Sequence, residues 1–306
     1  TDAFPLIFFS RFVLGLGGAL MVVLLSGIVA RILTGRALQV ANGVNSVAFN
    51  TGLAVAITFS SQLAGSPAFA VVLAAALSLV VLALWLVVAR RGLASATRPG
   101  AAVDSSYTMR DGFREWFNWV FALSYTGLLS YYIVAFTFMD PETIRWVVYA
   151  GVIGALSGTV VSARVSDARK PVIAVVCGAL QVVAAAAVLG MSDHRLAPLV
   201  GVILGLVIFF PMPFFVQLAF IRPGVSPRQI AVTFSIFWAV AYAGSVVIIQ
   251  IFAWIADATG GLENGIPVSN IPLVFIVIVE STFVIGTFLL WRWFRAQATI
   301  AERELV

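Results

Sequence analysis

Charged side chains are scarce in this sequence of 306 residues. Asp, Glu, Lys and Arg together make up 10% of it, whereas hydrophobic residues make up 61%. Soluble domains carry about 25% charged residues. A chain with so few charges cannot cover a water-facing surface, so an ordinary soluble domain is excluded. The solvent of most of the chain must be lipid.

Cysteine and histidine are nearly absent, with one of each, Cys177 and His194. A single cysteine excludes an internal disulfide, and without a Cys/His cluster the usual metal sites are excluded too. His194 follows Asp193 in a short gap between apolar runs, which is typical of a solvated loop residue. The sequence therefore predicts neither a metal nor a cofactor.

Patterns that carry catalysis are also missing. The sequence has no paired-carboxylate site, no Gly-x-x-x-x-Gly-Lys phosphate loop and no histidine with a catalytic partner. We therefore expect a protein that is not an enzyme and that draws energy from an ion or solute gradient. The net charge of +5 does not indicate nucleic-acid binding, because the basic residues lie between apolar runs, where they act as topology signals.

Long apolar runs are what the sequence has in abundance. A membrane-spanning helix needs about 20 mostly apolar residues. The sequence predicts an all-α, polytopic transmembrane helical bundle with nine spans: 5–30, 38–62, 67–89, 116–138, 144–163, 171–191, 197–221, 230–256 and 270–292. The gaps between spans are short except for 90–115, which is a polar linker.

The basic residues predict how the chain is oriented. Of the 18 Lys and Arg, 15 fall in gaps on one side, two fall on the other side, and Arg11 lies within the first span. By the positive-inside rule the rich side is cytoplasmic. We therefore expect a cytoplasmic central linker and C-terminus, with residue 1 outside, in a bacterial-type inner (plasma) membrane.

The spacing of the spans predicts a two-part organisation. Three spans, a linker and six spans fit a 12-helix protein of which helices 4–12 are present. In this interpretation 1–89 is the remainder of the N-terminal half, 90–115 is the central linker and 116–306 is the C-terminal half. A plan of six and six helices is common among secondary transporters.

The first span carries a recognisable motif. Arg11 is followed four residues later by Gly15-Leu-Gly17-Gly18, which resembles the fourth-helix motif of the major facilitator superfamily. The resemblance covers the whole chain, and the predicted topology agrees with it. It implies a 12-helix fold and alternating access, in which two halves rock around a central site.

Other segments are similar to the same superfamily. The stretch from Gly158 to Lys170 resembles a degenerate Gly-x-x-x-Asp-Arg loop signature that lacks the usual second glycine. Residues 253–261 resemble the outer end of an eleventh helix, and 116–133 resemble a seventh helix of the cyanate-transporter-like branch. The fifth helix lacks the Gly-Pro pair of drug–proton antiporters, which favours uptake or anion transport over multidrug efflux.

Two charges are predicted to lie inside spans. Arg11 is about 10 Å along its helix, where a charge is costly and usually faces a cavity or a partner. Its roles could be attraction of an anionic solute, charge coupling to proton movement, or capping of backbone near the surface. Glu280 lies in the middle of the last span. It could handle a proton, or be a protonated structural residue.

Polar stripes mark the remaining candidates for solute binding or coupling. The resemblance implies that the helices at 116–138 and 230–256 line the central cavity. Interfacial anchoring is the alternative for the tyrosines and tryptophan, helix–helix hydrogen bonding for the asparagines, and a tolerated proline kink for the region of Gln217. The candidates are Asn42, Asn45, Asn50, Asn118, Tyr125, Tyr132, Gln217 beside Pro211 and Pro213, Trp238 and Tyr242.

The prediction is a secondary active transporter of a small solute, in particular a small anion or organic acid. Its partners would be that solute, the bilayer and a co-transported proton. Two alternatives stay open. One is efflux of hydrophobic aromatic compounds, and the other is a non-transporting scaffold or sensor with the same fold.

Overall fold

The computed structural model describes residues 35–59, 65–92, 107–138, 140–190, 195–263 and 266–304, with isolated positions between 5 and 33. The elements are α2 (Gly35–Thr58), α4 (Pro67–Gly92), α5 (Met109–Arg114), α6 (Trp116–Phe138), α7 (Pro141–Ser162), η1 (Asp167–Arg169), α8 (Lys170–Gly190), α9 (Ala197–Phe209), α10 (Met212–Gln217), α11 (Pro227–Ala258), β1 (Leu262–Glu263), β2 (Ile266–Pro267), α12 (Ile271–Glu280) and α13 (Thr282–Glu304). The described chain is all-α apart from the two-residue strands.

Six stretches of the described chain are long and apolar enough to cross a membrane. They are Trp116–Phe138, Pro141–Ser162, Asp167–Val188, Ala197–Gln217, Pro227–Ala258 and Ile271–Thr299. They match the last six predicted spans. Helices α2 and α4 coincide with the second and third predicted spans, and α4 includes the apolar stretch Val71–Val87. The first predicted span lies outside the continuously described ranges.

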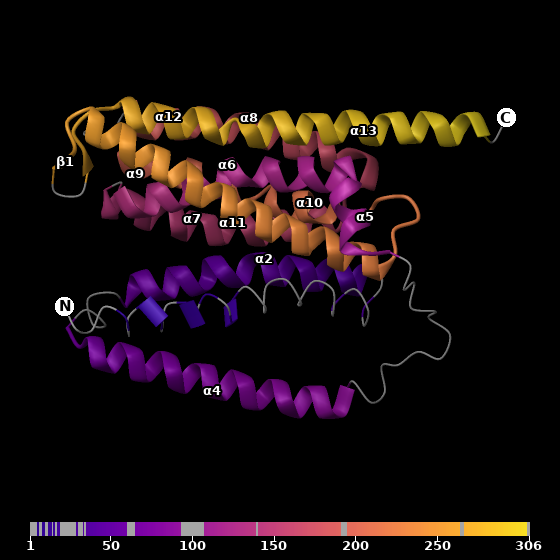
Figure 1. Ribbon diagram of the computed structural model, residues 1–306, viewed down its shortest axis with the longest axis horizontal. Helices are drawn as coiled ribbons and strands as arrows, with labels where there is room; N and C mark the ends of the chain where they lie inside the picture. Colours follow the sequence, from indigo (N-terminus) through magenta and orange to yellow (C-terminus); the bar gives the residue numbers. More distant parts are fainter. Residues whose placement is uncertain are drawn as a thin grey trace.

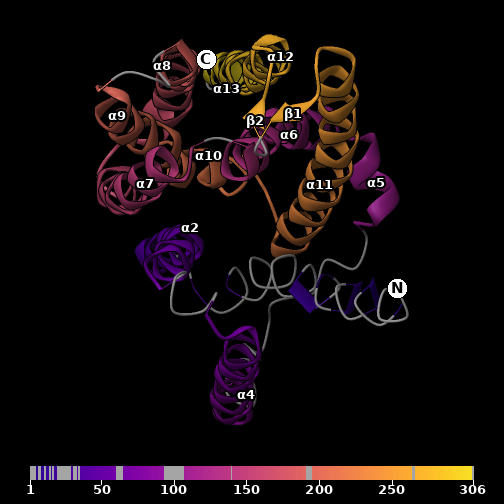
Figure 2. The ribbon, with the colours of Figure 1, turned by 90° about the vertical axis from the view of Figure 1, so that its left-hand side faces the viewer.

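The six spans form a bundle of alternating direction (Figure 1). Helix α6 lies at its centre, where it packs against α11, α12 and α13, while α7 and α8 pack against α9. Helix α2 runs along the bundle and contacts α7 and α10. Helix α4 lies farther from the bundle than α2 in both ribbon views (Figures 1 and 2).

Local sequence explains where the helices begin. Asp140 accepts a hydrogen bond from the backbone N–H of Thr143, and Pro141 follows it at the first helical position of α7. Ser226 and Gln229 form a reciprocal capping box at the start of α11. Such caps satisfy backbone donors that have no partner inside the helix.

Two spans are interrupted. The span at 197–221 is divided into α9 and α10 because Pro211 and Pro213 have no N–H for the helical ladder. The last span is divided at Ser281, between α12 and α13, and it continues to Glu304 rather than ending near 292. The proline break agrees with the predicted interruption, whereas the one at Ser281 has no Pro or Gly signal.

Glycines allow α7 and α9 to pack closely. A Cβ at Gly205 would overlap the backbone carbonyl oxygen of Val147, and one at Gly154 would lie 2.7 Å from the carbonyl oxygen of Leu206. Small residues at helix contacts let the backbones approach closely. This strengthens van der Waals packing inside the lipid bilayer, where the hydrophobic effect does not drive helices together.

The arginine-rich segments gather at one end of the bundle. Helix α5, the α7–α8 turn, the α10–α11 turn and the C-terminal end of α13 lie at that end, whereas the β1–β2 hairpin lies at the other (Figure 1). This grouping is what the alternation of basic gaps predicts. The direction of the chain in the membrane stays a prediction.

Candidate functional site: a cavity between α2 and the C-terminal bundle

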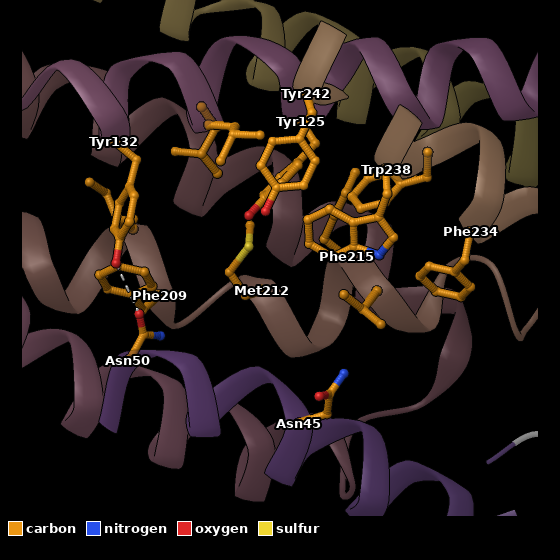
Figure 3. A pocket seen from close by; sticks show the side chains of 15 residues that line it. Asn45, Asn50, Tyr125, Tyr132, Phe209, Met212, Phe215, Phe234, Trp238 and Tyr242 are labelled. Atoms are coloured by element: carbon orange, nitrogen blue, oxygen red, sulfur yellow. Dashed lines mark hydrogen bonds between the residues drawn. The ribbon is translucent and has the colours of Figure 1, made fainter. Parts of the chain in front are cut away.

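A cavity of about 160 Å³ lies between α2 and the helices that follow the linker. Figure 3 shows two side chains of α2 facing aromatic side chains from the bundle. Its lining comes from α2, α6, α9, α10 and α11: Asn45, Asn50, Tyr125, Leu128, Leu129, Tyr132, Ile208, Phe209, Met212, Phe215, Val216, Phe234, Phe237, Trp238 and Tyr242.

Helix periodicity explains which side chains reach the cavity. Tyr125 and Tyr132 are seven residues apart on α6, so they lie two turns apart on one face. Trp238 and Tyr242 are four residues apart on α11 and stack with ring centroids 5.7 Å apart. The structure thus brings together the two aromatic stripes that the sequence indicated.

The asparagines of α2 complete the lining from the opposite side. Tyr132 donates a hydrogen bond through its hydroxyl to Asn50 Oδ1 over 3.3 Å, and Asn50 is buried. Asn45 lies five residues earlier, facing the same cavity (Figure 3). A direct side-chain bond therefore links α2 to α6 across the cavity.

The aromatic packing around the cavity is well defined. Tyr125 meets Trp238 edge to face at 5.6 Å, and it packs against Phe237 at 5.0 Å. Phe121 stacks on Phe215 at 4.5 Å beneath this layer. Rings held by such contacts present fixed faces to a ligand and lose little conformational freedom on binding.

The described lining is chemically mixed but uncharged. It offers phenol, indole and amide groups among apolar side chains, with no Asp, Glu, Lys or Arg among the described lining residues. A concave, mostly apolar site with a few placed polar groups is typical of small-molecule binding. This cavity suits a small organic solute with an apolar or aromatic body and a few hydrogen-bonding atoms.

Asn118 lies outside this lining, although it shares the face of Tyr125 by spacing. Its amide donates to the carbonyl of Gly112 over 2.9 Å and to Glu115 Oε2 over 3.2 Å, and its Oδ1 accepts a bond from Thr233 over 2.8 Å. Arg222 joins the same network. Asn118 thus ties α6 to α5 and α11 at the arginine-rich end of the bundle.

Arg222 is the centre of that network. It donates to Glu115 Oε2 over 2.8 Å and to Thr233 Oγ1 over 2.9 Å, and its guanidinium lies 4.5 Å from the ring centroid of Phe117. A largely buried charge is tolerated where it is paired and hydrogen-bonded. The sequence assigned Arg222 only a topological role, because its ion-pair partner Glu115 lies 107 residues away along the chain.

The remaining candidates are placed as follows. Gln217 is buried and donates to Ser162 Oγ over 3.2 Å, so it links α10 to α7 outside the cavity lining. Glu280 is fully buried in the bundle, also outside that lining. Arg11 and the side chain of Asn42 lie outside the described residues.

The apolar part of the lining was missed by sequence reasoning. Phe209, Met212, Phe215, Phe234 and Phe237 lie in spans where nearly every residue is apolar. Nothing in such a run separates a lining position from a packed or lipid-facing one. Only the proline break beside Met212 and Phe215 could have drawn attention to them.

The chain matches no family model, no curated protein and no solved structure. Its class therefore follows from the structure itself: the described part of the chain holds six apolar helices of membrane-crossing length, packed in an all-α bundle, which define a multi-pass membrane protein.

Proposed function

We propose that this protein is a secondary active transporter of the major facilitator type that moves a small solute through the cavity between α2 and the C-terminal bundle. In this proposal α2 and α4 are helices 5 and 6 of a 12-helix fold, and the six later spans are helices 7–12. The two halves rock around the cavity, driven by an ion or solute gradient.

The observation that carries the proposal is the composition of the cavity. Its walls come from both sides of the long linker, with Asn45 and Asn50 on one side and Tyr125, Tyr132 and Trp238 on the other. A site at the interface of two helical halves can be exposed to alternate sides when the halves move. A scaffold protein would have no need for polar side chains converging on such a cavity.

The solute class proposed from the sequence is a small anion or organic acid attracted by Arg11. That residue lies outside the described part of the chain. Helix 4 of the proposed fold would bring its charge toward the uncharged lining described above. Anion binding should therefore depend on Arg11, with the aromatic walls holding the rest of the solute.

A second candidate is transport of hydrophobic aromatic compounds. It is favoured by the lining, in which Tyr125, Trp238 and Tyr242 present ring faces and no described residue supplies a charge. Aromatic rings bind such compounds by stacking and edge-to-face contact. In this case Arg11 would be structural, and solute binding would not require it.

Ligand-induced thermal stabilisation of the purified protein in detergent tests the proposal. A ligand that binds the folded state raises stability by about 2.7 kcal/mol at a hundredfold excess over its Kd. The panel contains small anions, organic acids, neutral metabolites, amines and lipophilic aromatics. We expect Trp238→Ala to abolish the stabilisation and Trp254→Ala to keep it, because Trp254 is on the exposed face of the same helix.

The outcomes separate the candidates. Stabilisation by anions that is lost in Arg11→Gln supports the anion transporter. Stabilisation by lipophilic aromatics alone, unchanged in Arg11→Gln, supports the second candidate. If no compound in the panel stabilises the protein, the transporter proposal loses its support, and the scaffold interpretation is favoured.

A further inference from the structure

Three side chains deep in the bundle have no hydrogen-bond partner among the described residues for any of their polar side-chain atoms. They are Tyr131 on α6, Gln181 on α8 and Glu280 at the end of α12, and five of their side-chain N and O atoms make no hydrogen bond. Each residue is at most 1% exposed. Buried polar groups are nearly always hydrogen-bonded, so unpaired ones call for an explanation.

The packing of α8 against α12 and α13 places Gln181 and Glu280 at the same depth in the bundle. Gly178 lies against Phe283, whose ring would be 2.9 Å from a Cβ at that glycine. Helix α8 runs opposite to α12 and α13 (Figure 1). Gln181 is therefore displaced from Gly178 in the same direction as Glu280 is from Phe283, by about 4.5 Å in each case.

Helix α6 places Tyr131 near the same depth in the bundle through its contact with the α12–α13 junction. Gly127 lies directly against Thr282 and the carbonyl oxygen of Val279, which brings α6 and the α12–α13 junction into close contact. Tyr131 is one turn farther along α6 and interacts electrostatically with Glu280. Helix α12 contacts both α6 and α8.

No described residue neutralises the Glu280 carboxylate. It makes no salt bridge, and no charged group of α6, α8, α11 or α13 within the described ranges interacts with it electrostatically. Tyr131 is the titratable group on α6 that faces it, and Cys177 lies one turn from Gln181 on α8. An isolated carboxylate inside a membrane protein is very costly, so a positive charge must accompany it.

We propose that Glu280, Gln181 and Tyr131 form a binding site for a small monovalent cation, a proton or Na⁺, that is separate from the solute cavity. A proton would convert the carboxylate into a neutral acid that can donate a hydrogen bond. Na⁺ would be held by carboxylate, amide and phenol oxygens, which are hard ligands.

This inference rests on the proposed function for its role, because it makes the cation the coupling ion. Tyr131 and Tyr132 are adjacent on α6, yet Tyr131 faces the Glu280 site and Tyr132 lines the solute cavity. A shift of α6 that alters one site therefore alters the other. Binding of the cation and of the solute would then be linked reciprocally.

The test is thermal unfolding of the purified chain in detergent without any solute. One titration replaces choline chloride with NaCl at constant ionic strength and fixed pH, and the other lowers the pH without Na⁺. The variants are wild type, Glu280→Gln, Gln181→Leu and Glu142→Gln, whose exposed carboxyl is the matched control. We expect one titration to raise Tm by several degrees in wild type and in Glu142→Gln.

The same response should be absent in Glu280→Gln and should need several-fold more cation in Gln181→Leu. A Na⁺ response identifies a sodium site, and a response to pH alone identifies a proton site. An equal response in Glu280→Gln, or no response to either cation in wild type, overturns the inference. If Glu280→Gln does not fold, Glu280→Asp replaces it and should respond at a shifted cation concentration.

Failure of this inference is distinguishable from failure of the proposed function. Solute stabilisation that depends on Trp238, without any Glu280-dependent cation response, removes the cation site and leaves the transporter standing. A Glu280-dependent cation response without any solute stabilisation keeps the cation site and removes the support for the transporter.

Discussion

The C-terminal bundle and helix α4 are both strongly apolar, but they differ in what their side chains contact. Every residue of 71–87 in α4 is exposed, whereas α6 buries more than half of its residues, among them Asn118, Ser124, Thr126 and Ser130. The apolar side chains of α4 are therefore free to contact the surrounding lipid or another helix. In α6 it surrounds polar groups that are hydrogen-bonded inside the protein.

Helix α2 lies between these extremes. Asn50 and Val47 are buried against the bundle, while Val44 and Val55 are exposed. Thr58 Oγ1 lies 2.9 Å from Tyr149 Oη of α7, which adds a second polar contact between α2 and the bundle. The comparison shows that the specific contacts between helices are concentrated where polar side chains of one helix meet those of another. Mutations should therefore act strongly in the bundle and weakly in α4.

The largest effect is expected at the ion pair between buried Arg222 and partly exposed Glu115. Glu115→Ala removes the carboxylate partner of Arg222, which is only 7% exposed, and leaves a charge poorly paired. We expect a loss of about 3 kcal/mol in the free energy of unfolding, measured by denaturation in detergent. Glu142→Ala, at an exposed site, should change it by less than about 0.5 kcal/mol. Equal effects would contradict the role of the Arg222 network.

A smaller effect is expected at the α7–α9 contact. Gly205→Ala places a Cβ against the backbone of Val147, so the helices must separate. We expect a loss of about 2 kcal/mol from this overpacking. Gly52→Ala on α2 meets open space and should be neutral or slightly stabilising, because alanine favours helix. Comparable thermal stability of the two variants would show that α7 and α9 are not closely packed.

The cap of α7 should contribute about 1 kcal/mol. Asp140→Ala removes the acceptor for the backbone N–H of Thr143. Burial alone would raise the pKa of Asp140, but the bonds from Thr143 outweigh it, and the pKa is lowered below 3.8. The contribution is then present above pH 3.8 and lost as the pH falls through the lower, folded-state value. The difference between wild type and variant should shrink at acid pH, and a constant difference would refute this.

The smallest effect is expected in α4. Leu79 is 65% exposed, so Leu79→Ala removes few contacts within the described chain. We expect the free energy of unfolding in detergent to change by less than about 0.5 kcal/mol. A loss of several kcal/mol would mean that this face of α4 is packed against protein, and the contrast with the bundle would fail.

Helix positions were predictable because lipid imposes a length and an apolar composition on every span. The prediction of 116–138 agrees with α6, and the proline break in 197–221 separates α9 from α10. The interruption at Ser281 was not predictable, since no Pro or Gly stands beside it in the sequence. The β1–β2 hairpin, by contrast, is marked by the pair Asn264-Gly265 in the sequence, a common two-residue hairpin signal that sequence reasoning did not use.

The candidate site was predictable only in part. Tyr125, Tyr132, Trp238 and Tyr242 stand out in apolar spans, and their helical spacing places each pair on one face. The same reasoning grouped Asn118 with them, but it could not see that Glu115 and Thr233 hold its amide. Thr233 lies 115 residues from Asn118, and a contact over that separation is set by packing, which periodicity within one helix does not reveal.

The central claim is that a solute crosses the membrane through the cavity between α2 and the bundle. Solute counterflow in proteoliposomes tests it most directly, with the compound that stabilises the protein in detergent. We predict exchange well above that of protein-free liposomes for wild type and for Trp254→Ala, with exchange near the protein-free level for Trp238→Ala. Exchange that is unaffected by Trp238→Ala, or absent from the wild type, would contradict the account.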